Sequence, residues 1–184
     1  MVIPSQHLYS KSQKWDIISI KWDEVVNLLV TPFHLPHTML IGEYRHTIDD
    51  KNRLSLPSKF RKEMGKRVVV TPGLDSCLFI FTVDEWEKVS GRLSMSGSSM
   101  LQADNRGFNR YLLGRAVEVE VDAVGRMLLP ERLRHRANLE ATVVFVGVKD
   151  RVELWNEAAW DAYVNEVETR ADELAEKLGR PETN

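Results

Sequence analysis

The sequence has little of what stabilises small secreted domains and nothing that would span a membrane. It holds a single cysteine, Cys77, in 184 residues. This excludes a disulfide framework and a cysteine-based zinc site, and it fits a reducing cytosol. Because Cys77 begins the strand-like run 77–81, we expect a small core residue rather than a nucleophile. No apolar run approaches the roughly 18 residues of a membrane span, so no membrane partner is expected.

Motifs of catalysis and cofactor binding are also missing. The sequence contains neither a Gly-x-Gly-x-x-Gly fingerprint nor a Walker phosphate loop, and no Ser/His/Asp arrangement in motif context. His46 and His135 are isolated, and no carboxylate cluster stands at metal-ligand spacing. We therefore expect no enzyme activity, no cofactor and no metal site.

Charge is distributed unevenly along a chain of ordinary globular composition, with 43% apolar and 28% charged residues. The net charge of −2 argues against indiscriminate binding to nucleic acid. Residues 43–67, however, carry eight Lys or Arg against four Asp or Glu, and residues 106–136 carry seven against four. Residues 156–184 carry three basic and eight acidic residues. Solvated surfaces of mixed sign would explain the charge alone, but the basic residues recur in a pattern.

That pattern is a sequence repeat. Residues 48–61 return 73 positions later as residues 121–134, and after a one-residue slip the correspondence resumes at 74 positions. The equivalent pairs are Asp49 and Asp122, Arg53 and Arg126, Leu56 and Leu129, Pro57 and Pro130, Arg61 and Arg134, Gly73 and Gly147, and Trp86 and Trp160. Chance rarely produces so many matches, so the chain contains an internal duplication.

Both copies predict the same short strands. We expect strands at residues 44–48, 53–56, 67–71 and 78–82, and at residues 116–121, 126–129, 142–146 and 151–155. The first two strands of each copy are joined by a tight turn, in which Asn52 or Gly125 is expected to take a positive φ.

The helices expected around these strands are short. Pro57 and Pro130 predict the first position of a helix in each copy, and Asp84 and Asn156 predict the N-caps of the closing helices. Between the copies, residues 94–99 predict a flexible loop and residues 103–115 a helix. The side chains expected to turn inward from that helix are Phe108, Tyr111, Leu112 and Leu113.

Neither copy can form a stable core alone, because a unit of about 45 residues with strands this short buries too little surface. Two copies that interleave their hairpins into one closed barrel would share a core and remove the sheet edges. The expected fold is mainly β with α, a pseudo-twofold swapped-hairpin β-barrel with peripheral helices. The expected boundaries are an N-terminal extension at 1–38, the first repeat at 43–89, a helical linker at 90–114, the second repeat at 115–158 and an acidic tail at 159–184.

The duplicated motif resembles the MraZ family. Residues 42–57 read Gly-Glu-Tyr-Arg-His-Thr-Ile-Asp-Asp-Lys-Asn-Arg-Leu-Ser-Leu-Pro, and residues 71–75 read Thr-Pro-Gly-Leu-Asp. Three further segments resemble the same family: the second Asp-x-x-x-Arg copy, Val-Gly-Val at 146–148 and Glu-Leu-Trp at 153–155. The resemblance runs from Met39 to about Val167, roughly 70% of the chain. Two such motifs in tandem are a specific signal, whereas one would be weak.

The resemblance implies a fold of the SpoVT/AbrB superfamily, with tandem AbrB-type repeats. It also implies a ring-like homo-oligomer in the cytoplasm and nucleoid. Its partner would be double-stranded DNA, at repeats in the promoter of a division and cell-wall gene cluster that the family chiefly represses, its own gene included. Asn52 departs from the glycine that many members carry, but asparagine tolerates the same conformation. A second interpretation is an antitoxin-like or protein-interaction AbrB module that nucleates assembly and binds a partner through its acidic tail.

The DNA contacts are expected around the first turn. Arg53 is the first candidate, because a planar guanidinium offers bidentate hydrogen bonds to phosphate or guanine and a two-stranded ribbon can enter the major groove. Lys51 and Arg45 are expected near the tip of that ribbon. Asp49 and Asp122 are expected to structure the two turns, and an ion pair that merely fixes each turn remains the plainer interpretation. Arg126 has no basic neighbour on its turn, so we expect it to contribute less.

Basic residues on the two short helices are weaker candidates. Lys59 and Arg61 are included among the expected DNA contacts, and Lys62, Arg132, Arg134 and Arg136 could contact phosphates in the same way. A solvated helix face is the plainer interpretation of all of them. The tryptophans Trp86, Trp155 and Trp160 are expected in the core or an interface.

The two ends of the chain carry separate expectations. Residues 156–179 predict an acidic amphipathic helix with one apolar stripe, lying away from DNA. Family members usually start close to Met39, so residues 1–38 are extra. We expect no signal peptide there, because Asn27 and Pro32 break the apolar run and no basic segment precedes it. Lys-Trp-Asp occurs at residues 14–16 and 21–23, so TGGGA is encoded twice, 21 base pairs or about two DNA turns apart. We expect residues 1–38 to be largely translated operator; a genuine N-terminal arm is the alternative.

Overall fold

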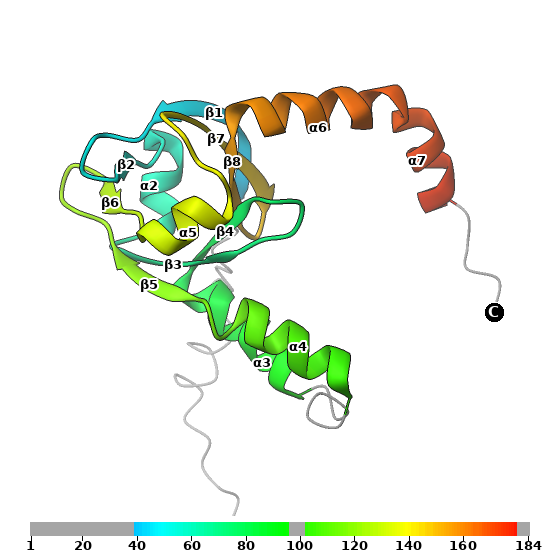
Figure 1. Cartoon of the computed structure of the whole chain (residues 1–184), viewed down its shortest axis with the longest axis horizontal. Coiled ribbons are helices and arrows are strands. Elements are labelled where there is room, and N and C mark those ends of the chain that lie inside the picture. Colours follow the sequence, from blue (N-terminus) through cyan, green and yellow to red (C-terminus); the bar gives the residue numbers. More distant parts are fainter. Residues whose placement is uncertain (1–38, 96–101, 180–184) are drawn as a thin grey trace, which may run out of the picture. The chain divides into compact units, whose positions relative to one another are not determined.

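The computed structural model describes residues 39–95 and 102–179, and the expectations for residues 1–38 lie outside this range. The first half of the described chain contains β1 (Leu40–Thr47), β2 (Arg53–Ser55), α2 (Ser58–Met64), β3 (Arg67–Pro72), β4 (Leu78–Thr82) and α3 (Val83–Met95). The second contains α4 (Ala103–Leu112), β5 (Val117–Glu120), β6 (Arg126–Leu128), α5 (Glu131–Arg136), β7 (Thr142–Lys149), β8 (Val152–Asn156), α6 (Glu157–Thr169) and α7 (Ala171–Gly179). The order β-β-α-β-β-α therefore occurs twice (Figure 1).

Six strands form one antiparallel sheet in the order β1-β7-β8-β4-β3-β5. The first strand of each repeat pairs with the third strand of the other, since β1 lies beside β7 and β5 beside β3. The two central strands, β4 and β8, also come from different repeats. If each strand is replaced by its equivalent in the other repeat, the same order is obtained, read from the opposite edge of the sheet. The sheet therefore has the twofold symmetry of the sequence repeat.

The remaining strands, β2 and β6, form a separate two-stranded ribbon. Single bridges from Ile48 to Leu54 and from Val121 to Met127 join the ribbon to the ends of β1 and β5. The fold class is therefore mixed β and α with a mostly antiparallel sheet, as expected. The described strands form no closed barrel, because β1 and β5 are the outer strands of the sheet.

One core joins the sheet to the ribbon. Its strands are rich in β-branched residues, which pack well on a pleated surface. Phe60 and Leu133 reach the core from α2 and α5, and both are almost completely buried. Leu54 and Met127 reach it from the inner face of the ribbon, at 0% and 1% exposure. Cys77 is buried as well, as expected of a core residue.

Most expected helix boundaries are confirmed within a few residues. Asn156 caps α6 as expected, with its side chain accepting a hydrogen bond from the backbone N–H of Ala159 at 3.1 Å. Pro57 and Pro130 are the N-caps of α2 and α5, one position earlier than expected. Asp84 lies inside the first turn of α3, and the hydroxyl of Thr82 accepts from the backbone N–H of Glu85 instead.

Two expectations about the helices are wrong. Phe108 of α4 is 41% exposed rather than turned inward, whereas Leu112 of the same helix is buried. The acidic tail is two helices, because α6 ends before Arg170 and α7 starts after it. Residues 96–99 of the expected loop lie outside the described part of the chain, and α3 includes Ser94. No helix in the described ranges is long and apolar enough to cross a membrane.

Candidate nucleic-acid interface

Asp49 organises the turn between β1 and β2. Its Oδ1 accepts from the backbone N–H groups of Lys51 and Arg53 at 2.9 and 2.8 Å, and its Oδ2 accepts from Nε of Arg53 at 2.7 Å. The backbone N–H of Asn52 donates to the carbonyl of Asp49 at 3.0 Å. Asn52 has φ +57°, the left-handed conformation that the sequence predicted.

Asp122 repeats this geometry between β5 and β6. Its Oδ1 accepts from the backbone N–H groups of Val124 and Arg126 at 3.0 and 2.8 Å, and its Oδ2 accepts from Nε of Arg126 at 2.9 Å. Gly125 takes φ +83°, also as predicted. The shared Asp-x-x-x-Arg spacing therefore produces the same turn twice, because one carboxylate satisfies two backbone donors and one guanidinium.

Both aspartates are held in the charged form. The hydrogen bond from the backbone N–H of the following arginine is the largest influence on each aspartate, and it keeps the pKa of Asp49 and of Asp122 below the ordinary value. Burial opposes this lowering, and the side chain of the same arginine adds to it. A depressed pKa stabilises the folded turn above the unfolded value of about 3.9. Both turns are therefore fixed at neutral pH.

The arginines keep most of their donors. Each guanidinium uses only Nε within its turn, so the two terminal nitrogen atoms of Arg53 and of Arg126 have no partner among the described residues. The side chains are 37% and 41% exposed. The carboxylate orients each guanidinium and leaves its planar fork available to an acceptor on another molecule.

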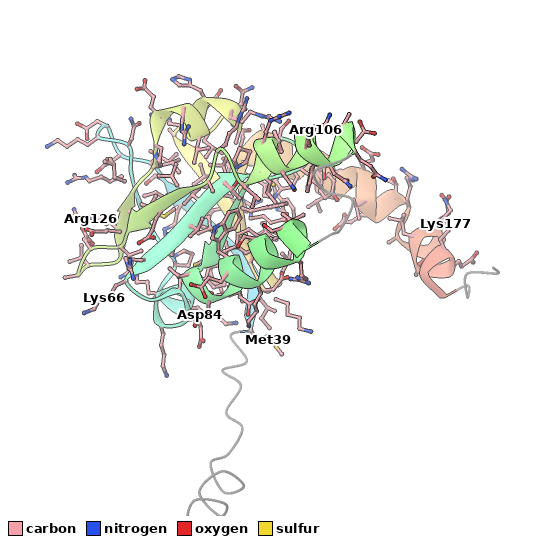
Figure 2. The ribbon with its side chains drawn as sticks, turned by 90° about the horizontal axis from the view of Figure 1, so that it is seen from below. Met39, Lys66, Asp84, Arg106, Arg126 and Lys177 are labelled. Carbon is pink, nitrogen blue, oxygen red and sulfur yellow. The ribbon has the colours of Figure 1, made fainter. Side chains whose placement is uncertain are left out.

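Strand pairing puts the two turns on one surface. In the β2–β6 ribbon Arg53 is opposite Leu128, and Arg126 is opposite Ser55. These four residues share the outer face, because side chains alternate along a strand and the intervening Leu54 and Met127 are buried. Arg53 and Arg126 line one shallow hollow of about 250 Å³. Figure 2 shows Arg126 projecting from its turn at the edge of the molecule.

Each turn is supported by an arginine from the short helix of the other repeat. Arg61 of α2 donates from Nε to the carbonyl of Leu56 at 2.7 Å and lies against Gly125, where a Cβ would clash with its guanidinium. Its equivalent Arg134 of α5 donates to the carbonyl of Leu139 at 3.0 Å and to the side chain of Asn52. Each turn is therefore tied to the short helix of the other repeat, through residues that are equivalent in the repeats.

The other expected contacts are distributed over the first turn and α2. Lys51 is exposed within the first turn, beside Arg53. Lys59 is exposed on α2, and Arg61 is committed in part to supporting the second turn. Of the expected contacts, Arg53, Arg126 and Lys51 thus belong to the two turns, and Lys59 and Arg61 lie on α2.

Arg45 does not lie near the tip of the ribbon, and that expectation is wrong. It pairs with Glu43 of its own strand, and with Glu157 at 3.2 Å and Asp161 at 2.8 Å, both on α6. The acidic helix packs against β7 and β8, and β1 pairs with β7. Arg45 is therefore held by three carboxylates, a more favourable position for a cation than an unpaired place beside other arginines.

Two members of this surface and one supporting contact were missed in the sequence. Ser55 and Leu128 could have been found from the period-2 alternation that puts them on the same face as the two arginines. The role of Arg134 as a support for Asn52 had no local signal, since 82 residues separate the two. No group of three or more His, Cys, Asp or Glu residues in the described ranges could hold a metal ion.

Comparisons with known proteins agree with one another. The family model described as "MraZ protein, putative antitoxin-like" matches residues 39–110 and 112–180. Proteins named "Transcriptional regulator MraZ" from Thermoanaerobacter sp. (strain X514) and Caldanaerobacter subterraneus are 43% and 44% identical over 140 residues. Each alignment covers 76% of this chain and 96% of the relative. A relative of the same name from Moorella thermoacetica is 44% identical with the same coverage.

Proposed function

This chain belongs to the MraZ family, and on that premise we propose that it regulates transcription by binding double-stranded DNA through the outer face of the β2–β6 ribbon. The observation that carries the proposal is the pair of oriented arginines, Arg53 and Arg126, that line one hollow of that face. Their terminal nitrogens have no partner within residues 39–95 and 102–179. The name shared by the relatives, transcriptional regulator, agrees with it.

The ribbon suits a DNA groove for geometric and electrostatic reasons. A two-stranded antiparallel ribbon fits the major groove, where a guanidinium can donate two hydrogen bonds to guanine. Asp49 and Asp122 hold each guanidinium before binding, so less side-chain entropy is lost on contact. Lys51 and the α2 residues Lys59 and Arg61 would add contacts to phosphates.

The proposed function also includes assembly of several subunits on one DNA target. We infer a swapped-hairpin arrangement of the AbrB type, supported by the pairing of β1 with β7 and of β5 with β3. Subunits would assemble as a ring-like homo-oligomer in the cytoplasm and nucleoid, with one ribbon each. Weak contacts from several ribbons would then add through effective concentration on promoter repeats, and the regulator would repress its own gene cluster.

The proposal is tested by measuring binding to the DNA immediately upstream of the gene. Arg53→Ala should weaken binding by about 1–3 kcal/mol if the contact to a base is bidentate, and Arg126→Ala should weaken it less. Both variants should fold, since Asp49 and Asp122 still accept from the backbone and an exposed ion pair contributes roughly 0–1 kcal/mol. Arg92→Ala, on the exposed side of α3, is the matched control. Unchanged affinity for Arg53→Ala would refute the assignment.

A second function, assembly with a protein partner, is favoured by the antitoxin-like description of the family and by the acidic helices α6 and α7. Salt separates the two functions. Binding of DNA by n arginines and lysines should fall with a slope of about 0.9n in log affinity against log salt concentration. Capture of a partner through an apolar helix face should change little over the same range.

A further inference from the structure

A second cluster of arginines lies away from the ribbon's outer face. Arg132 and Arg136 of α5, four residues apart and so on one side of the helix, lie with Arg115, which precedes β5. Together with Leu133 and with Pro72 at the end of β3, they line a hollow of about 270 Å³. None of these residues lines the hollow between Arg53 and Arg126.

Tyr111 of α4 holds two of these arginines in place. Its ring centroid lies 5.8 Å from the guanidinium carbon of Arg115 and 5.6 Å from that of Arg136. Its hydroxyl donates to the carbonyl of Gly73 at 2.6 Å and accepts from Arg136 at 3.0 Å. Two guanidiniums are therefore ordered by cation–π contacts with one aromatic ring, which require no counter-charge.

The charge of this cluster is uncompensated within the described residues. Arg115, Arg132 and Arg136 form no ion pair there, and the one bond of Arg132 is to the carbonyl of Arg115 at 3.3 Å. Other arginines of the chain do have carboxylate partners, such as Arg67 with Glu118 and Arg151 with Glu153. Three like charges gathered around one hollow favour the binding of an anion.

The repeat supplies an internal comparison. The positions equivalent to Arg115, Arg132 and Arg136 in the first copy are Gly42, Lys59 and Glu63. The first copy therefore has a glycine, a lysine and a carboxylate where the second has three arginines, although the two copies form the same elements. The fold does not require the arginine cluster, so its chemistry belongs to this hollow alone.

We propose that the hollow lined by Arg115, Arg132 and Arg136 is a binding pocket for a phosphate group. A terminal or inorganic phosphate presents three or four acceptor oxygens to converging guanidinium forks, whereas a carboxylate presents two. A phosphodiester of a DNA backbone presents two free oxygens and a single negative charge. A terminal phosphate carries close to two negative charges at neutral pH, which suits three cations. The hollow is slightly smaller than the roughly 300–1,000 Å³ of pockets for drug-sized ligands, so it accommodates the phosphate rather than a large attached group.

The phosphate can come from a small phosphorylated molecule or from a DNA backbone, and titration of inorganic phosphate tests the shared chemistry first. Affinity is measured by calorimetry, with ionic strength kept constant by chloride, for the full chain and for Arg132→Gln. Arg132 makes a single long hydrogen bond, so this variant keeps the fold; its thermal midpoint without phosphate verifies that. Arg110→Gln, an exposed arginine of α4 that does not line the pocket, is the matched control.

Loss of one charge-assisted contact should weaken phosphate binding by about tenfold in Arg132→Gln and leave Arg110→Gln unchanged. Arg136→Gln should repeat the loss. Equal affinities in all four proteins, or no binding by the unsubstituted chain, would overturn the proposal. If Arg132→Gln also weakens DNA binding and phosphate competes with DNA, the source is the backbone; unaltered DNA binding identifies a small phosphorylated ligand. The phosphate titration contains no DNA, so its failure is distinct from failure of the ribbon as the DNA-binding surface.

Discussion

At the scale of single residues, one aspartate side chain accepts three hydrogen bonds in each of the two turns. Asp49 and Asp122 each satisfy two backbone N–H groups and one guanidinium Nε, which leaves the outer part of the arginine free. The plain interpretation, an ion pair that fixes the turn, and the functional one therefore describe the same geometry. That geometry also requires a residue at the tip of each turn that accepts a positive φ, which is Asn52 in the first turn and Gly125 in the second.

Gly125→Ala should destabilise the protein by about 1 kcal/mol or more. An alanine at φ +83° is strained, and its Cβ would displace the Arg61 guanidinium that supports the turn. Gly107→Ala is the matched control, because Gly107 lies within α4 with nothing near its Cβ position. That change should stabilise by about 0.5–1 kcal/mol. Urea unfolding of both variants measures the difference, and equal effects would contradict the role of the turn.

At the scale of elements, the acidic tail has two parts with different attachments. Helix α6 packs against β7 and β8 and is fixed to β1 by the ion pairs of Glu157 and Asp161 with Arg45. Its apolar side carries Trp160 against the buried Trp155. Helix α7 follows after Arg170 (Figure 1). Helix α6 is therefore attached to the sheet, and α7 is a separate element beyond it.

A chain that ends after Val152 should not fold. It lacks most of β8, which lies between β7 and β4, and with it the buried Leu154 and Trp155. Removal of one large core side chain already costs about 2–5 kcal/mol, and total stability is only about 5–15 kcal/mol. A chain that ends after Val167 keeps the whole sheet and should remain folded. Sedimentation and circular dichroism compare them; a soluble, folded product from the shorter chain would contradict the shared core.

At the scale of the described unit, residues 39–95 and 102–179, the two repeats form one structure by exchanging strands. Each outer strand of the sheet is paired with the other repeat, and the ribbon takes one strand from each. The functional surface has the same origin, since Arg53 and Arg126 come from different repeats. Neither repeat contains a complete sheet, a complete ribbon or the paired arginines.

The halves 39–114 and 115–179 should therefore be unfolded when expressed separately. The first would leave β1 without β7, and the second would leave β5 without β3. Mixing the halves in equal amounts should restore the β signal in circular dichroism, because each supplies the strands that the other lacks. A half that folds alone as a monomer would contradict the interdependence of the repeats.

The sequence by itself determined the local structure. The duplication predicted eight short strands close to those observed, and the tips at Asn52 and Gly125 take the positive φ that was expected. The Asp-x-x-x-Arg spacing is local, since its partners are four residues apart. Residue preferences and short spacings are sufficient to specify such features.

Tertiary structure decided which residues share a surface. Pairing of β2 with β6 put Arg53 beside Arg126, and packing of α6 drew Arg45 toward its carboxylates, away from the tip where it had been expected. The cluster around Tyr111 likewise joins α4 to α5. An arginine binds whichever partner lies closest in space, and a sequence pattern does not contain that distance. Charge on the chain was visible in the sequence, but its pairing depended on contacts between residues up to 116 positions apart.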